Sequence, residues 1–279
     1  MMFKTIVLHV DASPQFDARM ALAARMAQDF EAHLVGCAVT GLSLRDFVFL
    51  ACSNRSAVPS GEYEQMREAP RIHLQQFTQQ AESLGVDSYE SRMVDEDAVQ
   101  ALQLQARYAD LLVVGRGDPD SRGLRGTARL PEELALHSTR PVLVVPDGYH
   151  REGGIGKVTI GWNASMEATR AVQTALPLLR RASKVQVAVI NPDEMPERHG
   201  EQPGADLALY LARHGVQIEV VQIETAQTTA GALLDLARSS GADLLVAGAR
   251  GHSRYREWAL GGVTRDLLDQ ATLPLLLAH

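Results

Sequence analysis

The sequence has few of the features that mark several large classes of protein. It contains only two cysteines, Cys37 and Cys52, in 279 residues, too few for a disulfide scaffold or a thiolate zinc site. Its longest apolar stretches, such as residues 47–52 and 273–278, are far shorter than the roughly 20 residues of a membrane span. We therefore expect a cytoplasmic protein with reduced thiols and no membrane partner.

A concentrated basic surface is also missing. The net charge is −7 with a pI near 5.7, and the basic residues are scattered, which argues against a nucleic-acid partner. The nine histidines include no His-x3-His or similar pair, so no metal site is expected. The acidic run Asp95-Glu96-Asp97 and the serines Ser13 and Ser165 precede helix-like segments and are interpreted as helix caps. No spacing of Ser, His, Cys and Asp supports a catalytic residue.

The sequence does contain an internal repeat. Residues 109–115, Ala-Asp-Leu-Leu-Val-Val-Gly, recur 133 positions later at 242–248 as Ala-Asp-Leu-Leu-Val-Ala-Gly. Near the start of each copy, Val-Asp-Ala-Ser at 10–13 resembles Trp-Asn-Ala-Ser at 162–165. This duplication predicts two domains, at 1–147 and 154–279, with a polar linker between them and an insertion at about 40–63 in the first.

Each copy alternates apolar, strand-like runs with helix-like patterns. Strands are predicted at 5–10, 34–39, 88–94, 111–114 and 142–145, and again near Val158, Val185, Ile218, Leu244 and Leu275. Runs without polar alternation predict strands covered by helices on both faces. The expected fold class is α/β, with two tandem, doubly wound, open parallel sheets of Rossmann-like type.

Residues 141–145 and 274–278 close the two copies and are expected at sheet edges. Because an apolar edge must be paired or covered, we expect these strands to pair around a pseudo-two-fold axis and make the chain an internal pseudo-dimer. The insertion leaves two alternatives open. Its apolar part at 47–52 packs against its own domain, or it covers a ligand or forms an interface, including that of a homodimer.

The strongest local signal follows the fourth strand of the second copy. Gly248 and Gly251 are separated by two residues, and Gly261 and Gly262 follow after nine more, at the start of a helix. Glycine permits positive φ and close backbone approach, and N–H groups at a helix start favour an anion. Thr264 adds a hydroxyl. The pattern predicts phosphate binding; the alternative is glycines that only form turns and a tight helix–strand contact.

These features resemble the universal stress protein family, in its tandem form, over essentially the whole chain. Gly248, Gly251 and Gly261 match the glycines of the family pattern Gly-x2-Gly-x9-Gly-[Ser/Thr]. The resemblance implies a regulatory role in stress and ATP binding, with Mg²⁺ accompanying ATP, in the C-terminal domain. The nucleotide-binding residues that it implies are Trp162, Asn163, Ala164, Ile190, Gly248, Arg250, Gly251, His252, Gly261, Gly262, Val263 and Thr264.

The two copies depart from that pattern in different ways. In the second copy, Gly262 replaces the usual Ser/Thr, and Asn163 replaces the aspartate that nucleotide-binding members carry after the first strand. The first copy keeps an acidic residue there, Asp11. Its loop is changed at the positions that match Gly251, Gly261, Gly262 and Thr264, which hold Asp118, Ala128, Arg129 and Pro131. A shorter loop built on Gly126 and Thr127 is an alternative, but we expect one nucleotide per chain, in the second copy.

Two other classes of function stay open at this point. One is a slow ATPase or nucleotidyl-transfer enzyme, although the second loop contains no evident general base or metal-binding carboxylate. The other is an interaction scaffold that binds no nucleotide. Fold class alone does not separate them.

Overall fold

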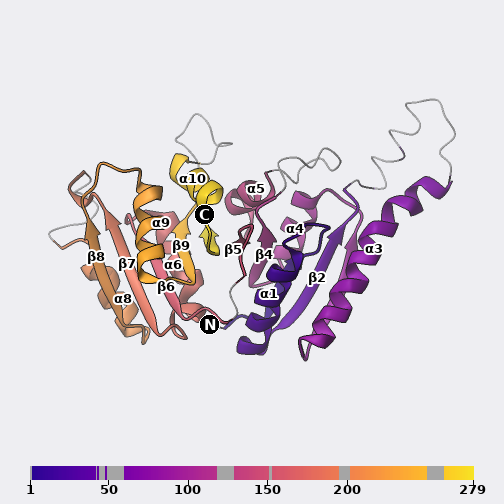
Figure 1. The fold of residues 1–279 in the computed structure, drawn as a ribbon, viewed down its shortest axis with the longest axis horizontal. Coiled ribbons are helices and arrows are strands. Elements are labelled where there is room, and N and C mark those ends of the chain that lie inside the picture. The colour runs from indigo at the N-terminus through magenta and orange to yellow at the C-terminus, as the bar shows by residue number, and fades with distance from the viewer. Residues whose placement is uncertain are drawn as a thin grey trace. The chain divides into compact units, whose positions relative to one another are not determined.

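The computed structural model describes residues 2–41, 43, 48, 60–117, 129–150, 153–194, 202–249 and 261–279. The chain forms two compact units (Figure 1). The first unit is Phe3–Leu134, and the second is Met1–Met2 with Ala135–His279. Each unit is described by itself below.

The first unit contains a parallel sheet in the strand order β3–β2–β1–β4. Its strands are β1 (Thr5–His9), β2 (His33–Val39), β3 (Tyr89–Val94) and β4 (Leu111–Gly115). Its helices are α1 (Phe16–Phe30), α3 (Ser60–Ser83) and α4 (Ala98–Ala106), and α5 (Leu130–His137) begins at its end. In the register, Ile6 of β1 lies between Leu34 of β2 and Leu111 of β4.

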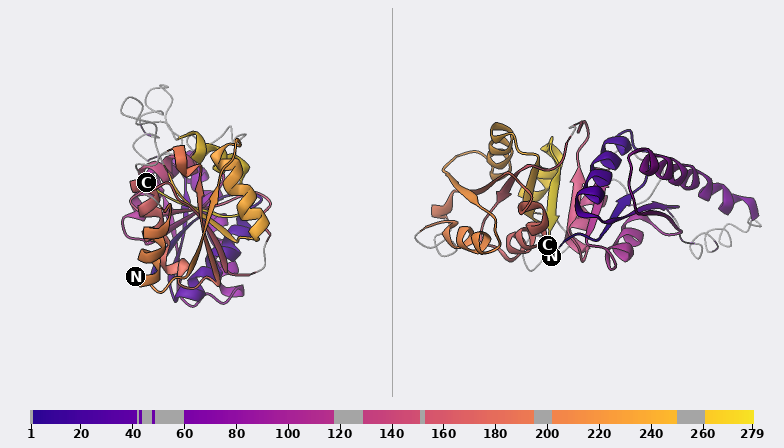
Figure 2. Two further views of the ribbon diagram at one scale, coloured as in Figure 1. Left: turned by 90° about the vertical axis from the view of Figure 1, so that its left-hand side faces the viewer. Right: turned by 90° about the horizontal axis from the view of Figure 1, so that it is seen from below.

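The second unit has the strand order β5–β10–β9–β6–β7–β8. Its strands are β5 (Val142–Val145), β6 (Lys157–Gly161), β7 (Lys184–Ile190), β8 (Ile218–Ile223), β9 (Leu244–Gly248) and β10 (Leu275–Ala278). Its helices are α6 (Met166–Leu179), the short η1 (Pro192–Glu194), α8 (Ala205–Arg213), α9 (Thr229–Ser240) and α10 (Gly262–Gln270). Helices lie on both faces of each sheet, as expected for a doubly wound fold (Figure 2).

All of the ladders within the second sheet are parallel except one. β5 pairs antiparallel with β10, where Leu276 lies opposite Leu143. The predicted pairing of the two closing strands is therefore confirmed. It covers an apolar edge that would otherwise offer unpaired backbone groups for aggregation.

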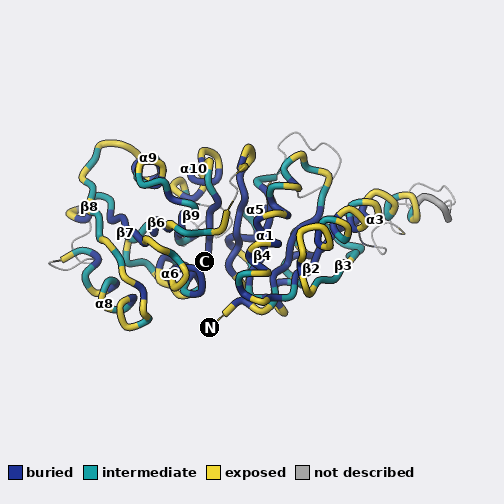
Figure 3. The backbone as a smooth tube through the Cα atoms, turned by 60° about the horizontal axis from the view of Figure 1, so that its bottom comes forward, coloured by how far each residue is buried: buried dark blue, intermediate teal, exposed yellow. Residues whose placement is uncertain are grey.

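The core consists of the apolar runs seen in the sequence. Every residue of β4 and β10 is buried, whereas the outer strands β3 and β8 are only partly buried (Figure 3). Burial at roughly 25 cal/mol per Å² of apolar surface makes these central strands the main stabilising element. Cys37 of β2 is a free, buried thiol, and burial raises its pKa to about 12.

Helix starts agree with the sequence at two of three predicted caps. Asp97 accepts a hydrogen bond from the Gln100 amide at 3.1 Å, and Ser165 accepts one from the Ala168 amide at 3.2 Å. The prediction for Ser13 was wrong, because Gln15 is the cap residue of α1. The Ser13 hydroxyl instead donates to Asp11 at 2.6 Å, since that carboxylate is the stronger acceptor nearby.

Helix α3 begins at Ser60, within the insertion predicted at about 40–63. Its first turns extend beyond the sheet of the first unit (Figure 1). Of residues 47–52, the structure describes Val48 alone, so both alternatives for this apolar segment lie outside the described residues. Among the described helices, none combines the length and the apolar character needed to cross a membrane.

Candidate functional site

Three of the predicted residues lie at the carboxyl ends of neighbouring strands in the second unit. Trp162 follows β6, Ile190 ends β7 and Gly248 ends β9. These strands are parallel and adjacent, so their carboxyl ends share one edge of the sheet. The Trp162 amide donates to the carbonyl of Ala188 at 2.9 Å, which continues the ladder to that edge.

The strand order also marks a topological switch point at this edge. From β6 the chain proceeds to β7 and β8 on one side, and β9 then lies on the other side of β6. In open α/β sheets, ligands bind in the crevice at such a switch point, outside the carboxyl ends of the strands. The predicted residues after β6 and at the end of β9 therefore lie where this fold binds ligands.

The turn between β6 and α6 contains Asn163 and Ala164. The Asn163 side-chain oxygen accepts a hydrogen bond from the Ser165 amide at 3.2 Å, and Ala164 has a φ of 55°, an uncommon left-handed conformation for alanine. Asn163 is exposed. Its amide group also carries N–H donors that the bond to Ser165 does not use.

Gly248 is required by helix packing. A Cβ atom there would lie 2.5 Å from the Ala168 nitrogen and 2.6 Å from the Glu167 carbonyl carbon, both in the first turn of α6. Gly248 is not among the glycines with positive φ, so it does not supply the left-handed backbone that the sequence suggested. For this residue the structure supports the tight helix–strand contact, which brings the start of α6 against the end of β9.

The start of α10 carries the second glycine pair. Gly261 is the cap residue, with φ −64° and ψ 150°, and therefore offers no capping side chain. Gly262 and Val263 are exposed, and the first turn holds no acidic residue. Thr264 is only 3 % exposed, so the expectation that its hydroxyl serves a ligand is not supported by its position.

The centre of the predicted loop lies outside the described residues. This applies to Arg250, Gly251 and His252 in the second unit, and to Asp118, Gly126, Thr127 and Ala128 in the first. Within the described part of the chain, no group of three or more His, Cys, Asp or Glu side chains could hold a metal ion.

The matching edge of the first unit holds a charged cluster. The Arg19 guanidinium of α1 donates to Asp11 at 2.6 Å, and its other terminal nitrogen is 3.4 Å from the Ser13 hydroxyl. The Nδ1 atom of His9, at the end of β1, lies 3.3 Å from the second Asp11 oxygen. Arg19 is 1 % exposed and Asp11 31 %, so the cluster is largely shielded from water.

Burial and charge shift both titrating groups of this cluster. Burial alone would raise the pKa of Asp11, but the charges of Arg19 and His9 and hydrogen bonds from Ser13 and Arg19 outweigh it and lower the pKa to about 2. Burial lowers the pKa of His9 to about 4, although Asp11 opposes the change. At neutral pH the cluster is an Arg19–Asp11 ion pair beside a neutral histidine.

Sequence reasoning missed Arg19 and His9. The available signal was a lone arginine beside the apolar stripe of Met20, Ala23 and Ala27 in α1, all buried. A charged residue on the buried face of a helix needs a charged partner. Asp11, eight residues earlier and directly after the first strand, was the candidate within reach.

The start of α5 differs from that of α10 in charge. Its first turn contains Glu132 and Glu133, and Pro131 lacks an N–H donor. The Arg129 guanidinium is paired with Glu132 at 2.9 Å, so its charge is already compensated. Carboxylates in the first turn make this helix start less favourable for an external anion.

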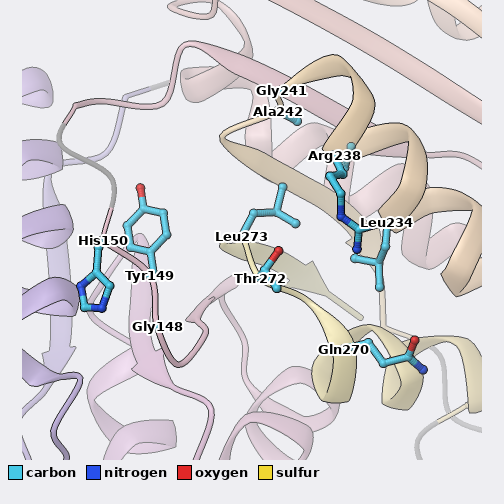
Figure 4. A pocket seen from close by; sticks show the side chains of 11 residues that line it. Gly148, Tyr149, His150, Leu234, Arg238, Gly241, Ala242, Gln270, Thr272 and Leu273 are labelled. Carbon is cyan, nitrogen blue, oxygen red and sulfur yellow. The ribbon is translucent and has the colours of Figure 1, made fainter.

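A separate cavity of about 330 Å³ lies at the opposite edge of the second sheet. Figure 4 shows its lining from the segment before β6, from the end of α9 and from the segment before β10, including Tyr149, Arg238 and Thr272. Since β9 and β10 begin at this edge, the cavity is at their amino ends. It is therefore distinct from the predicted site.

The family model for the universal stress protein family matches the chain twice, over residues 2–146 and 154–279. A universal stress protein structure from Archaeoglobus fulgidus DSM 4304 is similar over 98 % of this chain and 95 % of its own, with 14 % identity and a TM-score of 0.73. A functionally unknown protein from Pseudomonas aeruginosa PAO1 is similar over 99 % and 92 %, with 13 % identity and a TM-score of 0.61.

A solved universal stress protein in complex with cAMP is 23 % identical over 52 % of this chain and 98 % of its own, with a TM-score of 0.36. No curated protein sequence matches the chain significantly. The full-length likenesses establish the fold, and the two family matches cover nearly the whole chain. The chain therefore belongs to the universal stress protein family and contains two tandem domains of its Rossmann-like type.

Proposed function

We propose that this stress-response protein binds one adenine nucleotide, ATP, at the carboxyl edge of its second unit and acts by binding rather than by catalysis. One observation carries the proposal. The switch point between β6 and β9 lies at the sheet edge where Trp162, Ile190 and Gly248 are found. Helix α10, whose cap residue is Gly261, follows β9 in the chain. A crevice of this type suits the base and ribose of a nucleotide.

Helix α10 suits the phosphates. The first N–H groups of a helix point outward from its start, and the cap residue Gly261 places no side chain over them. The absence of acidic residues in its first turn keeps the positive end of the helix dipole available to an anion. Magnesium would accompany ATP and be held by its phosphates, since the described residues contain no metal-ligand cluster.

The test is calorimetric titration of the purified chain with ATP, with and without Mg²⁺. We expect close to one site per chain. Replacing Gly261 with valine should abolish binding, because its Cβ and methyl groups would stand at the helix start. The φ of −64° is compatible with valine, so this variant should fold.

Gly156→Ala is the matched control. Gly156 precedes β6 at the opposite edge, and a Cβ there would make only ordinary contacts, with the Asp243 carboxylate 3.5 Å away. Its ATP binding should equal that of the wild type. Binding that survives Gly261→Val, or two equivalent sites per chain, would exclude the proposal.

Binding without turnover is a separate expectation. Phosphoryl transfer needs an oriented nucleophile and charge stabilisation at the transferred group, and the sequence of the second loop contains no evident general base or metal-binding carboxylate. ATP retained unchanged over hours supports a regulatory protein that acts by binding. Steady hydrolysis that disappears on His252→Ala would establish an enzyme instead.

A further inference from the structure

The first unit has its own switch point, and a side chain of the same unit lies in it. The chain leaves β1 for β2 and β3 on one side, while β4 lies on the other side of β1. Arg19 bridges the two strand ends. Its guanidinium bonds Asp11, just after β1, and a Cβ on Gly115, the last residue of β4, would collide with its Nη1 atom.

The guanidinium is enclosed on a third side by an aromatic ring. Its carbon lies 5.6 Å from the centroid of the Phe16 ring, within the range of a cation–π interaction. The Asp11 carboxylate, the Phe16 ring and the end of β4 enclose Arg19, which is only 1 % exposed. The guanidinium is therefore held in one position between β1 and β4.

The second unit has small, neutral residues at the matching positions. Strand β1 (Thr5–His9) matches β6 (Lys157–Gly161) residue by residue at a shift of 152. At that shift, the first unit's Asp11, Phe16 and Arg19 correspond to Asn163, Ala168 and Ala171. Ala168 and Ala171 are buried at 2 % and 1 % exposure, so no guanidinium or ring is present there.

We infer that Arg19 is a built-in occupant of the switch-point crevice of the first unit, and that it closes this crevice to nucleosides. A ligand entering between β1 and β4 would have to displace a buried arginine and leave Asp11 without its partner, which is costly in a shielded site. Position 19, together with its match Ala171, thus decides which unit binds. The inference rests on the proposed function in one respect, namely that the corresponding crevice of the second unit binds the nucleoside part of ATP.

Removing Arg19 defines the chemistry of the ligand that would enter. The Asp11 carboxylate would then accept hydrogen bonds from hydroxyl or amino groups, while its negative charge would repel phosphates. The suitable probe is therefore adenosine, which has donors and no charge.

The experiment compares adenosine binding by calorimetry in the full-length wild type and in Arg19→Ala. We expect the variant to bind one more equivalent per chain than the wild type. Arg25→Ala is the control, because Arg25 is exposed on the same helix and pairs with Asp29; it should leave the stoichiometry unchanged. If Arg19→Ala fails to fold by circular dichroism, Asp11→Asn/Arg19→Ala removes both charges and reproduces Asn163 and Ala171 of the second unit, with Phe16 retained.

The outcomes separate the inference from the proposed function. One equivalent in the wild type and two in the variant supports both. None in the wild type and one in the variant supports the role of Arg19 and shows that the second crevice does not hold a nucleoside without phosphates; the ATP titration of the wild type then decides the proposed function separately. A folded variant with no additional equivalent overturns the inference, whatever the wild type binds.

Discussion

The carboxyl edges of the two units are made from equivalent strands and helices, yet they differ in nearly every polar residue. In the first unit, Asp11 is paired with Arg19 and helix α5 begins with two glutamates. In the second, Asn163 forms a local turn, Ala171 replaces the arginine and α10 begins with Gly261 and no acid.

The difference shows that a duplicated fold tolerates changes at this edge. Parallel strands and their covering helices are held by apolar burial, which both copies retain. The loops and turns at the strand ends contribute little to that burial, so their residues can diverge without loss of the fold. The first unit satisfies its own charges, whereas the second leaves a helix start without carboxylates.

The largest expected effect concerns the two glycines that end β4 and β9. Gly248→Ala should destabilise the second unit by about 3 kcal/mol, because the new Cβ meets the backbone of α6, which cannot move aside as a side chain can. Gly115→Ala should cost less, about 1–2 kcal/mol, because its Cβ meets one end of the Arg19 guanidinium, which can shift slightly while its other nitrogen keeps the bond to Asp11. Urea denaturation measures both. Equal losses would show that packing at the two strand ends does not differ.

The next expected effect is a loss of folding stability in acid, which arises from His9 of the first unit. The folded pKa of His9, about 4, is below its ordinary value of 6.5, so the unfolded state binds more protons between these values. Its contribution to stability is complete above pH 6.5 and falls by roughly 3 kcal/mol as the pH drops through 4. Gly161 occupies the matching position of the second unit and has no such group.

The measurement is the free energy of unfolding as a function of pH for wild type and His9→Gln. The variant should lose less stability than the wild type on acidification from pH 6.5 to 4. His150→Gln, which removes an exposed histidine from the second unit, is the control and should follow the wild type. Parallel curves for wild type and His9→Gln would contradict the assignment.

A smaller effect is expected when the charge at the start of α10 is made to resemble that of α5. Val263 is 42 % exposed, so Val263→Glu should fold normally. Its carboxylate near the phosphates should weaken ATP binding by roughly 1 kcal/mol, about fivefold in Kd, and leave adenosine binding unchanged. Gln270→Glu makes the same change of charge at the other end of the helix and should not alter Kd. A parallel loss for ATP and adenosine would show that the phosphates do not lie at this helix start.

The smallest effect concerns Asn163. Asn163→Asp restores the acidic residue of the first unit at an exposed turn, and its stability should remain within about 0.5 kcal/mol of the wild type. Because position 171 holds alanine, the new carboxyl lacks a guanidinium partner, and its pKa should be higher than the value of about 2 at Asp11. NMR titration of both carboxyls gives the comparison, and an equally low pKa at position 163 would contradict it.

The sequence predicted the fold better than the site. Continuous apolar runs located the strands, and the repeat of residues 109–115 at 242–248 matched β4 with β9. The caps Asp97 and Ser165 followed from local chemistry. Ser13 did not, because the prediction considered the helix start alone and not the neighbouring Asp11 carboxylate.

At the site, the sequence identified which segments meet but not what each residue does there. Trp162, Ile190 and Gly248 do end neighbouring strands. Two expected roles were not supported: Gly248 makes room for α6 rather than supplying a positive φ, and the Thr264 side chain is buried. Both results depend on distances between elements, which the sequence does not give. Arg250, Gly251 and His252 stay predictions, and so do the domain limits at 147 and 154.

The sequence by itself determined the family, the duplication and the order of strands and helices, because periodicity and repeats are properties of the chain alone. Only the tertiary structure decided the register of the β5–β10 pair, in which Leu276 lies opposite Leu143, and that Arg19 lies between Asp11 and Gly115. Those contacts join residues that are distant in the chain or that belong to different elements. Their formation depends on how the helices pack against the sheet, which no local pattern of residues specifies.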